Sequence, residues 1–383
     1  MVGLVGCLES AIRHQPDIIL LDVMMPKLSG YEACKHIRER FGPQELPIIM
    51  LTAKSRISDL MSAFQCGASD YLTKPFIKDE LLARIKSHVR LARINNSYQR
   101  FVPSEYLKFL SRESITDVKL GDHVSREMAD MFSDIRSFTH RAEMMPPDES
   151  FRYINEYLGR VSPEIRRNNG VIIKYMGDGV MAIFPKSADD AVRAAIAELY
   201  KVDEYNTHLT EEKETPISIG LGLHFGHMMV GIVGEAGRMQ GDALSDTVNL
   251  TARIEGLTKY YGVTLLVSQQ ILDNLENPEE FELRLLDRVV VKGRSEPISI
   301  YEVVDGELDP KVRQLKIDLR ADFDNAVALY QDQQWATALS KFSEINIKNP
   351  DDKPVQVYIQ RLGELFQTPV STSWDGVWRF KTK

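Results

Sequence analysis

Two acidic side chains stand where an apolar strand meets a turn. Asp134 follows the apolar pair Met131-Phe132, and Asp178 lies between two glycines ahead of the apolar run from Val180 to Phe184. An aspartate beside a glycine is ordinarily a turn residue, and either one alone would be interpreted so. Two carboxylates at strand ends can instead share a pair of hard cations such as Mg2+, which take oxygen ligands and bridge to substrate phosphates. The pair therefore predicts two-metal phosphate chemistry.

The residues around each aspartate are more specific than the aspartates themselves. The strings Phe132-Ser-Asp-Ile-Arg-Ser-Phe-Thr139 and Lys174-Tyr-Met-Gly-Asp-Gly179 resemble the metal-binding segments of class III nucleotidyl cyclases. This resemblance is continuous over residues 125–304 and implies a ferredoxin-like catalytic domain that uses two Mg2+ or Mn2+ ions per active site. The residues that it assigns to the metal site are Asp134, Ile135 and Asp178, and those that it assigns to the substrate include Phe138 and Thr139.

A helical segment supplies further polar groups. In Asp246-Thr-Val-Asn-Leu-Thr-Ala-Arg-Ile-Glu-Gly256, Asn249 and Arg253 are four residues apart and share one helix face. Arg253 alone would be interpreted as a solvated arginine, but the whole string resembles the cyclase helix. The resemblance implies that Arg253 meets charge developing at the α-phosphate, that Asn249 orients the ribose, and that Lys292 binds the terminal phosphates.

The choice of base rests on Lys174 and Asp242. Adenine presents a donor amino group and an acceptor ring nitrogen, which a lysine and an aspartate can match. These residues stand at the base-selecting positions of adenylyl cyclases, whereas guanylyl cyclases typically have Glu and a small residue such as Cys there. We therefore expect ATP as the substrate and cyclic AMP with pyrophosphate as products. Many bacterial relatives carry Thr in place of Asp242 and respond to bicarbonate, so Asp242 weakens that expectation here.

Two alternatives stay open: a guanylate or dual-specificity cyclase, and a catalytically silent signalling module. The intact set of site residues disfavours the silent module. Lys174 and Asp178 are only four residues apart, yet they must act at opposite ends of an extended nucleotide. The family resolves this with a head-to-tail dimer, so a symmetric homodimer with two equivalent sites is expected. His224 and His227 are interpreted as satisfied polar residues rather than metal ligands.

These residues need particular elements to position them. We expect a strand over Met128–Phe132, a long helix over Asp148–Asn168, and a hairpin over Val171–Phe184 that folds at Gly177-Asp178-Gly179. Ile217–Phe225 alternates apolar and small or polar residues, which is typical of a strand with one buried face.

The first ninety residues carry a second group of polar side chains. Asp17–Asp22 and Leu46–Thr52 are continuous apolar runs that predict buried parallel strands of a doubly wound α/β layer. Asp22, Thr52 and Lys74 fall at strand ends, where such folds place their functional groups. The surrounding motifs resemble response-regulator receiver domains, which implies that Asp22 is the phosphoacceptor, Thr52 the switch hydroxyl and Lys74 the phosphate-binding lysine, with a sensor histidine kinase as partner.

Receiver domains begin with another strand, which bears an acidic pair that binds Mg2+. We expect this strand to precede Met1, so the chain is interpreted either as part of a longer protein or as carrying a structural remnant. Because the cation neutralises charge on the transferring phosphoryl group, we expect phosphorylation of Asp22 to be impaired without it.

The predicted domains are a partial receiver at 1–90, a helical linker at 91–124, the cyclase domain at 125–304 and a helical tail at 305–383. A heptad pattern over 78–100 fits either the last receiver helix or a helix paired between two chains. The tail carries two apolar stripes that resemble one tetratricopeptide-type helix pair, and a lone pair is expected to pack on its own domain or its dimer mate. The fold class is thus multidomain, α/β and α+β, with an α-helical tail.

Bulk composition limits the remaining options. The net charge of −8 argues against a nucleic-acid-binding surface, and we find no apolar run long enough for a transmembrane segment. Three cysteines, Cys7, Cys34 and Cys66, have neither CxxC spacing nor partner histidines. They are interpreted as buried free thiols, which favours a cytoplasmic protein.

Overall fold

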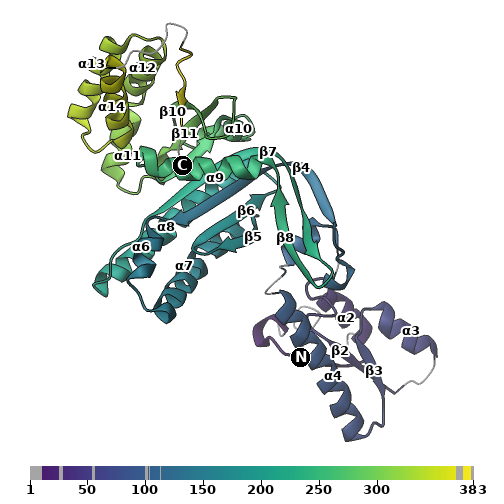
Figure 1. The fold of residues 1–383 in the computed structure, drawn as a ribbon. Coiled ribbons are helices and arrows are strands. Elements are labelled where there is room, and N and C mark those ends of the chain that lie inside the picture. The colour runs from purple at the N-terminus through teal and green to yellow at the C-terminus, as the bar shows by residue number, and fades with distance from the viewer. Residues whose placement is uncertain are drawn as a thin grey trace. The chain divides into compact units, whose positions relative to one another are not determined.

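The structure is a computed structural model that describes residues 11–25, 29–53, 57–99, 102, 104–112, 114–367 and 374–380. The chain divides into two compact units, Met1–Leu107 and Lys108–Lys383, and each is described by itself. Both units mix helices with strands (Figure 1). Every helix formed by the described residues is too short or too polar to span a bilayer.

The first unit is a layered α/β fold on a parallel sheet. Strand β2 (Ile48–Thr52) lies between β1 (Ile19–Asp22) and β3 (Asp70–Thr73), and both pairings are parallel. Its helices are α2 (Gly30–Arg38), α3 (Ile57–Gln65) and α4 (Lys78–Gln99). The predicted alternation of buried parallel strands with helices is confirmed. Helix α2 begins with a capping box, in which Ser29 and Glu32 each bond the other's backbone N–H.

Two of the three cysteines lie in this unit's core. Cys34 and Cys66 are buried free thiols, as predicted, whereas Cys7 lies outside the described residues. The predicted pairing of two chains along residues 78–100 stays a prediction. Helix α4 itself is held to its own sheet, because Arg84 and His88 both contact the Asp70 carboxylate at the start of β3.

The second unit is built on one sheet of nine strands in the order β12-β10-β11-β9-β7-β4-β6-β5, with β8 paired to β7. Its strands are β4 (His123–Ile135), β5 (Val171–Met176), β6 (Gly179–Phe184), β7 (Ile219–Glu235), β8 (Arg238–Leu244), β9 (Leu265–Ser268), β10 (Leu283–Val290), β11 (Ile298–Val303) and β12 (Trp378–Arg379). Its helices are α6 (Phe138–Glu143), α7 (Pro147–Arg167), α8 (Ala188–Glu211), α9 (Asp246–Tyr261), α10 (Gln269–Leu272), α11 (Pro310–Asp318), α12 (Arg320–Gln331), α13 (Trp335–Lys348) and α14 (Lys353–Gln367), and α5 (Ser104–Phe109) lies at the boundary of the two units.

The predicted strands, hairpin and long helix of this unit are confirmed, but two strands are longer than expected. Strand β4 begins at His123 rather than Met128, and β7 continues past Phe225 to Glu235. The extra residues pair with each other, from His123 opposite Gly231 to Glu127 opposite His227. The added residues of β4 are mostly exposed, so the sequence there lacks the apolar alternation that identified the rest, whereas Met228, Val230 and Ile232 of β7 do alternate and are buried.

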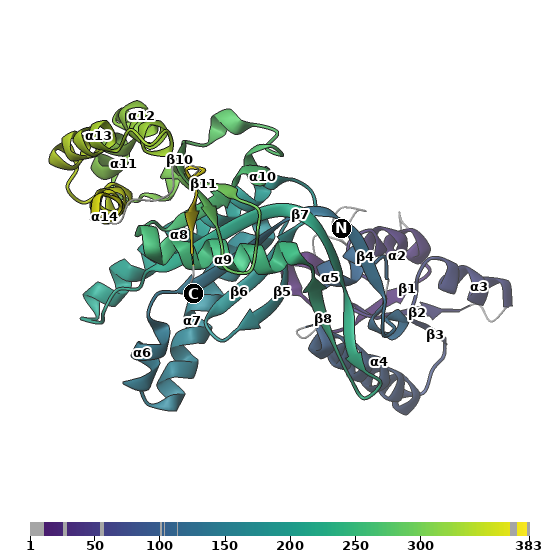
Figure 2. The same ribbon diagram turned by 45° about the horizontal axis from the view of Figure 1, so that its top comes forward.

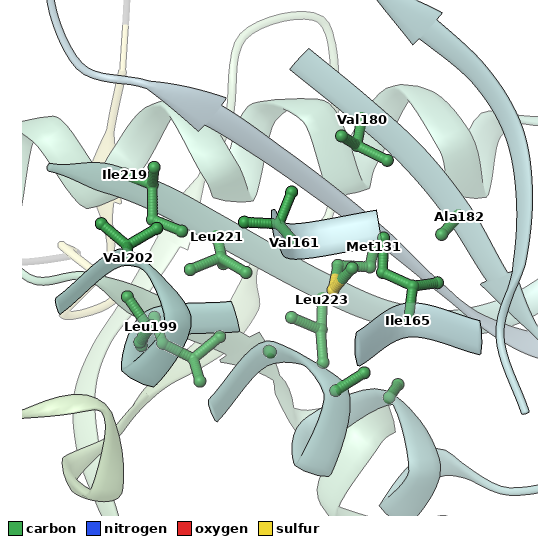
Figure 3. Close-up of a cluster of buried hydrophobic side chains, with 14 of the residues drawn as sticks. Met131, Val161, Ile165, Val180, Ala182, Leu199, Val202, Ile219, Leu221 and Leu223 are labelled. Atoms are coloured by element: carbon green, nitrogen blue, oxygen red, sulfur yellow. The ribbon is translucent and has the colours of Figure 1, made fainter. Parts of the chain in front are cut away.

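Strand β7 separates two layers of helices. Its residues Ile219, Leu221 and Leu223 face α7 and α8, where they join Val161, Leu199 and other apolar side chains in one core (Figure 3). The alternate residues, Gly220 and Gly222, face α9 on the opposite side. A Cβ at Gly222 would lie 2.2 Å from the Glu255 backbone nitrogen, so this approach of helix to strand requires glycine. Helix α9 is thereby seated directly on the sheet.

The tail packs on the sheet of its own unit, as expected for a lone helix pair. Apolar residues of α12, α13 and α14 share a second core with α9, β10 and β11, beside which the tail helices gather (Figure 2). The segment Trp374–Phe380 supplies β12, which pairs in parallel with β10. The resemblance of the tail to a tetratricopeptide pair remains a prediction.

The seat of α9 on β7 can be tested by matched glycine substitutions. Gly222→Ala should lower the free energy of unfolding by about 1–3 kcal/mol, because the added methyl overlaps the α9 backbone. Gly256→Ala is the control: it lies on the exposed side of the same helix with no atom within 4 Å, and should stabilise by about 0.5–1 kcal/mol. Urea unfolding followed by tryptophan fluorescence reports this unit, since Trp335, Trp374 and Trp378 are the chain's three tryptophans. Equal effects of the two changes would contradict the close approach.

Candidate active site

The two aspartates meet at one end of the sheet. Asp134 is the penultimate residue of β4, and Asp178 lies in the turn of the β5–β6 hairpin. Because β6 pairs with β4, with Val180 opposite Ser133, the turn lies beside the end of β4. The Ile135 backbone N–H donates to Asp178 Oδ2 at 3.2 Å. The predicted metal residues Asp134, Ile135 and Asp178 are therefore adjacent.

The electrostatics of this end fit a divalent cation. Loss of hydration raises the pKa of Asp134 to about 8, although the side chain keeps solvent access, and the nearby Asp178 and Glu255 carboxyls add to the shift. Like charges at this spacing favour a proton or a cation between them. Carboxylate oxygens are the ligands that Mg2+ prefers, so the donor set fits the predicted ions. Within the described residues, no cluster of three or more histidine, cysteine or acidic side chains is arranged to hold a metal.

Glu255 is a neighbour that the sequence did not single out. Its pKa is raised to about 7, mainly by burial, with Arg136 opposing the shift and Asp178 reinforcing it. Arg136 directly follows β4 and donates a hydrogen bond to the Val263 carbonyl beyond α9. Glu255 lies 77 positions after Asp178, and only the packing of α9 on β7 brings it close. No local pattern in the sequence could have identified it.

The predicted substrate residues Phe138 and Thr139 open helix α6. The Phe138 ring packs against the hydrophobic core and stacks on Tyr153, with ring centroids 6.1 Å apart and an interplanar angle of 11°. Thr139 is exposed. Ser137 precedes them in a left-handed conformation at φ 58°, which turns the chain sharply from β4 into the helix. Their part in substrate binding stays a prediction.

The two base-selecting residues form an ion pair. Lys174 on β5 donates from Nζ to Asp242 Oδ1 on β8 at 2.7 Å. The same carboxylate oxygen accepts the Ala243 backbone N–H at 2.8 Å, which fixes its position. A donor and an acceptor thus lie side by side, although the residues are 68 apart in the chain.

Helix α9 begins directly after β8, with Ser245 as its N-cap, and carries the other two predicted groups. Exposed Asn249 donates from Nδ2 to the Ser245 carbonyl at 3.4 Å. Arg253 has a buried Nη1 with no hydrogen-bond partner among the described residues. A buried guanidinium N–H without an acceptor is costly, and an anionic ligand would satisfy it.

The predicted phosphate-binding turn lies against Arg253. Lys292 is exposed in the turn that follows β10, and a Cβ at its neighbour Gly293 would lie 3.4 Å from Arg253 Nη2. Arg294 in the same turn pairs with Asp246 at the start of α9. The structure therefore brings Arg253 and the Lys292 turn together. Across the described residues, no hydrogen bond joins this group or the Lys174–Asp242 pair to the aspartate pair.

The two histidines are satisfied, as predicted. His224 is buried with Nδ1 2.8 Å from Ser268 Oγ, and burial lowers its pKa to about 4. His227 lies with Nε2 3.2 Å from Ser125 Oγ.

The receiver residues also meet at strand ends. Lys74, which directly follows β3, donates from Nζ to Asp22 Oδ2 at the end of β1. This bond, with one from the Met24 backbone, lowers the pKa of the Asp22 carboxyl. Thr52 ends the intervening strand β2, and its carbonyl accepts the Lys74 backbone N–H at 2.7 Å. The three predicted residues thus lie together at the end of the sheet where the strands finish.

Two family models match the chain. Residues 123–304 match the adenylate and guanylate cyclase catalytic domain, and residues 4–86 match the response regulator receiver domain. These matches cover the two groups of polar residues described above.

Two relatives are similar over longer stretches. The chain is 36% identical over 278 residues to the terminal-differentiation-specific adenylate cyclase of Dictyostelium discoideum, which covers 71% of this chain and 13% of that protein. It is 39% identical over 220 residues to an adenylate cyclase of Anabaena cylindrica, which covers 56% of this chain and 44% of that protein. The chain thus spans less than half the length of either relative.

The structure of a bacterial light-regulated adenylyl cyclase is similar in fold. It superposes with a TM-score of 0.54 at 21% identity, over 65% of this chain and 73% of that one. This structure shows that the fold is shared, and the two family matches show that the chain joins a response regulator receiver domain to an adenylate and guanylate cyclase catalytic domain of class III.

Proposed function

We propose that this chain is an adenylate cyclase that converts ATP to 3′,5′-cyclic AMP and pyrophosphate. The observation that carries the proposal is the 2.7 Å contact of Lys174 with Asp242. It presents one donor and one acceptor side by side, the pattern that adenine needs and guanine reverses. When ATP binds, the base would exchange this internal pair for hydrogen bonds to itself. Both relatives described above carry the name adenylate cyclase, which supports the same substrate.

In the reaction, the ribose 3′-hydroxyl loses its proton, and its oxygen forms a bond to the α-phosphorus. The bond between the α-phosphorus and the pyrophosphate oxygen breaks, and pyrophosphate leaves. Asp134, Ile135 and Asp178 would hold two Mg2+ or Mn2+ ions, which when bound lower the pKa of the hydroxyl and offset triphosphate charge. Arg253 directs Nη1, which has no hydrogen-bond partner within the described ranges, to the charge that develops at the α-phosphate. Asn249 orients the ribose, and exposed Lys292 meets the terminal phosphates, while Phe138 and Thr139 border the triphosphate.

We propose that two chains, arranged head to tail, complete each site. On α9, Glu255 and Arg253 are two residues apart and so project about 200° from each other around the helix. Glu255 contacts Gly222 of β7 beside the aspartates, whereas Arg253 contacts the Lys292 turn. One chain thus directs its acidic and basic groups apart. Strand β5, which carries Lys174, exposes Met176, and β8, which carries Asp242, exposes Met239 and Leu244. With exposed Met229 of the neighbouring strand β7 they form an apolar surface suited to a second copy.

The receiver domain suggests control by a two-component kinase. Asp22, with Lys74 bonded to it and Thr52 on the adjacent strand, is the proposed acceptor of a phosphoryl group from a sensor histidine kinase. The proposed place of action is the cytoplasm, where thiols such as Cys34 and Cys66 stay reduced.

A direct assay tests the reaction. Purified chain incubated with Mn2+ and ATP should form cyclic AMP at a rate at least about 10-fold above that of cyclic GMP formation from GTP. Asp134→Asn should lower kcat about 100-fold or more, because one metal carboxylate is lost. Product only from GTP would replace the proposal with a guanylate cyclase, and no product from either would indicate a silent module.

Base recognition can be tested at the ion pair. Lys174→Glu with Asp242→Cys should shift the ratio of kcat/KM for ATP and GTP toward GTP by about 100-fold, because donor and acceptor are exchanged. The single change Lys292→Gln is the control, since it should lower kcat/KM for ATP and for GTP alike. A double variant that keeps its preference for ATP would place base recognition elsewhere.

The shared site is tested by mixing inactive chains. Asp134→Ala and Arg253→Ala homodimers should each be nearly inactive. Their heterodimer should regain about a quarter to a half of wild-type activity, because one of its two sites combines the intact halves. Cyclic AMP is measured after isolating the heterodimer through two different affinity tags. Isolated heterodimers without activity would contradict the shared site.

A further inference from the structure

The end of helix α9 is tied to the C-terminal tail by a buried arginine. Arg361 of α14 is 1% exposed, and its Nη1 lies 2.5 Å from Asp287 Oδ2 on β10. Its Nη2 donates to the Tyr261 hydroxyl of α9 at 2.8 Å, and that hydroxyl donates to Asp287 at 2.5 Å. One guanidinium therefore joins three elements: the tail, the sheet and the helix that carries Arg253.

Tyr260, the residue of α9 next to Tyr261, is also held by the Arg361 guanidinium. Arg361 Nε donates to the Tyr260 hydroxyl at 3.3 Å, and the Phe380 ring meets Tyr260 edge-on at 4.9 Å between centroids. The Trp378 ring covers the Arg361 guanidinium at 4.3 Å. The last helix and the last strand thus close over the C-terminal end of α9 together.

The position of Tyr260 on α9 connects this contact with the active site. Tyr260 follows Arg253 by seven residues and Asn249 by eleven, so all three share one helix face. Helix α9 has 16 residues and is about 24 Å long, and a helix seated on a sheet moves as a rigid rod. A shift at Tyr260 is therefore passed to Asn249 and Arg253.

The same segment holds the phosphate-binding turn. Strand β12 pairs Trp378 with Val289 and Arg379 with Val290, and the Lys292 turn begins directly after this pairing. The Lys292 turn contacts Arg253 through Gly293. The tail therefore fixes both elements that flank the α-phosphate position.

We propose that residues 353–367 and 374–380 form a built-in clamp that fixes the position of α9 and of the Lys292 turn, with Arg361 as its central positioning residue. This rests on the proposed cyclase function. The clamp does not touch the nucleotide. It acts through Asn249, Arg253 and Lys292, whereas Asp134 lies on β4, Lys174 on β5 and Asp178 in the β5–β6 turn.

The test compares two arginines buried to the same 1% exposure in the contact between tail and sheet. Arg361→Lys keeps the charge but loses the planar fork that reaches Asp287 and both tyrosines. It should lower kcat about 10-fold or more, because Asn249 and Arg253 act in the transition state, and should raise KM for ATP less than Lys292→Gln does, because the lysine itself is kept. Arg284→Lys is the control: in the described part of the chain Arg284 bonds Glu302 and Asp352 and makes no bond to α9, so kcat should fall less than about 2-fold.

Mixed dimers separate positioning from a general loss of stability. Paired with an Asp134→Ala chain, an Arg361→Lys chain contributes only the metal half, so activity should match wild type paired with Asp134→Ala. Paired with an Arg253→Ala chain, it contributes the α9 half, and the roughly 10-fold loss should persist. Equal loss in both pairs, or an equal fall of kcat in Arg284→Lys, would overturn the clamp.

A second variant and a second comparison keep the test decisive if one of its parts fails. Trp378 lies at the sheet edge, and Trp378→Ala is the second variant if Arg361→Lys does not fold. Its kcat should fall, and in mixed dimers the loss should appear only where the variant chain contributes the α9 half. Full activity would overturn the clamp. If Asp134→Ala with Arg253→Ala is inactive as an isolated heterodimer, the shared site fails. The homodimer comparison of Arg361→Lys with Arg284→Lys still decides the clamp.

Discussion

The close approach of α9 to strand β7 is the constraint on which the catalytic unit depends. Glycine at 220 and 222 lets the helix backbone lie on the sheet, while Leu221 and its neighbours face the other core. This seat places Glu255 beside the aspartates and lets Thr251 donate to buried Asp130 of β4 at 2.6 Å. A helix held by one face has its opposite face fixed as well, and that face carries Asn249 and Arg253.

The helix therefore divides the charges of the site. Its side toward β7 meets an acidic end, where burial and the neighbouring carboxyls raise the pKa values of Asp134 and Glu255. Its other side meets Gly293 and the Lys292 turn, where Arg253 has an N–H with no partner in the part of the chain that the structure describes. Neither end is electrostatically satisfied by the other within one chain. A bound triphosphate with its cations would supply the missing charge of both signs, which supports the proposed site between two chains.

The sequence predicts those parts of this molecule that have a local signature. The parallel strands of the receiver and the hairpin around Asp178 follow from apolar runs and glycines. The motifs that resemble class III cyclases single out Lys174, Asp242 and Arg253 before any contact is known. Glu255 could not be found so, because its carboxyl reaches the aspartates only through packing between distant segments. The outer half of β4 was missed for a related reason: its residues pair with β7 beyond the core and show no alternation. Domain limits and site roles remain predictions.

The tail illustrates what a charge adds to an apolar contact. Its helices already share a hydrophobic core with α9, and such a face can slide with little loss of buried area. Arg361 with Asp287, and Arg284 with Glu302 and Asp352, are buried ion pairs whose desolvation cost largely offsets their attraction, so they are poor explanations of stability. Each can form in only one register, since a shift of one residue would leave a charge buried alone. Their contribution is therefore geometric, and it falls where two elements of the active site end.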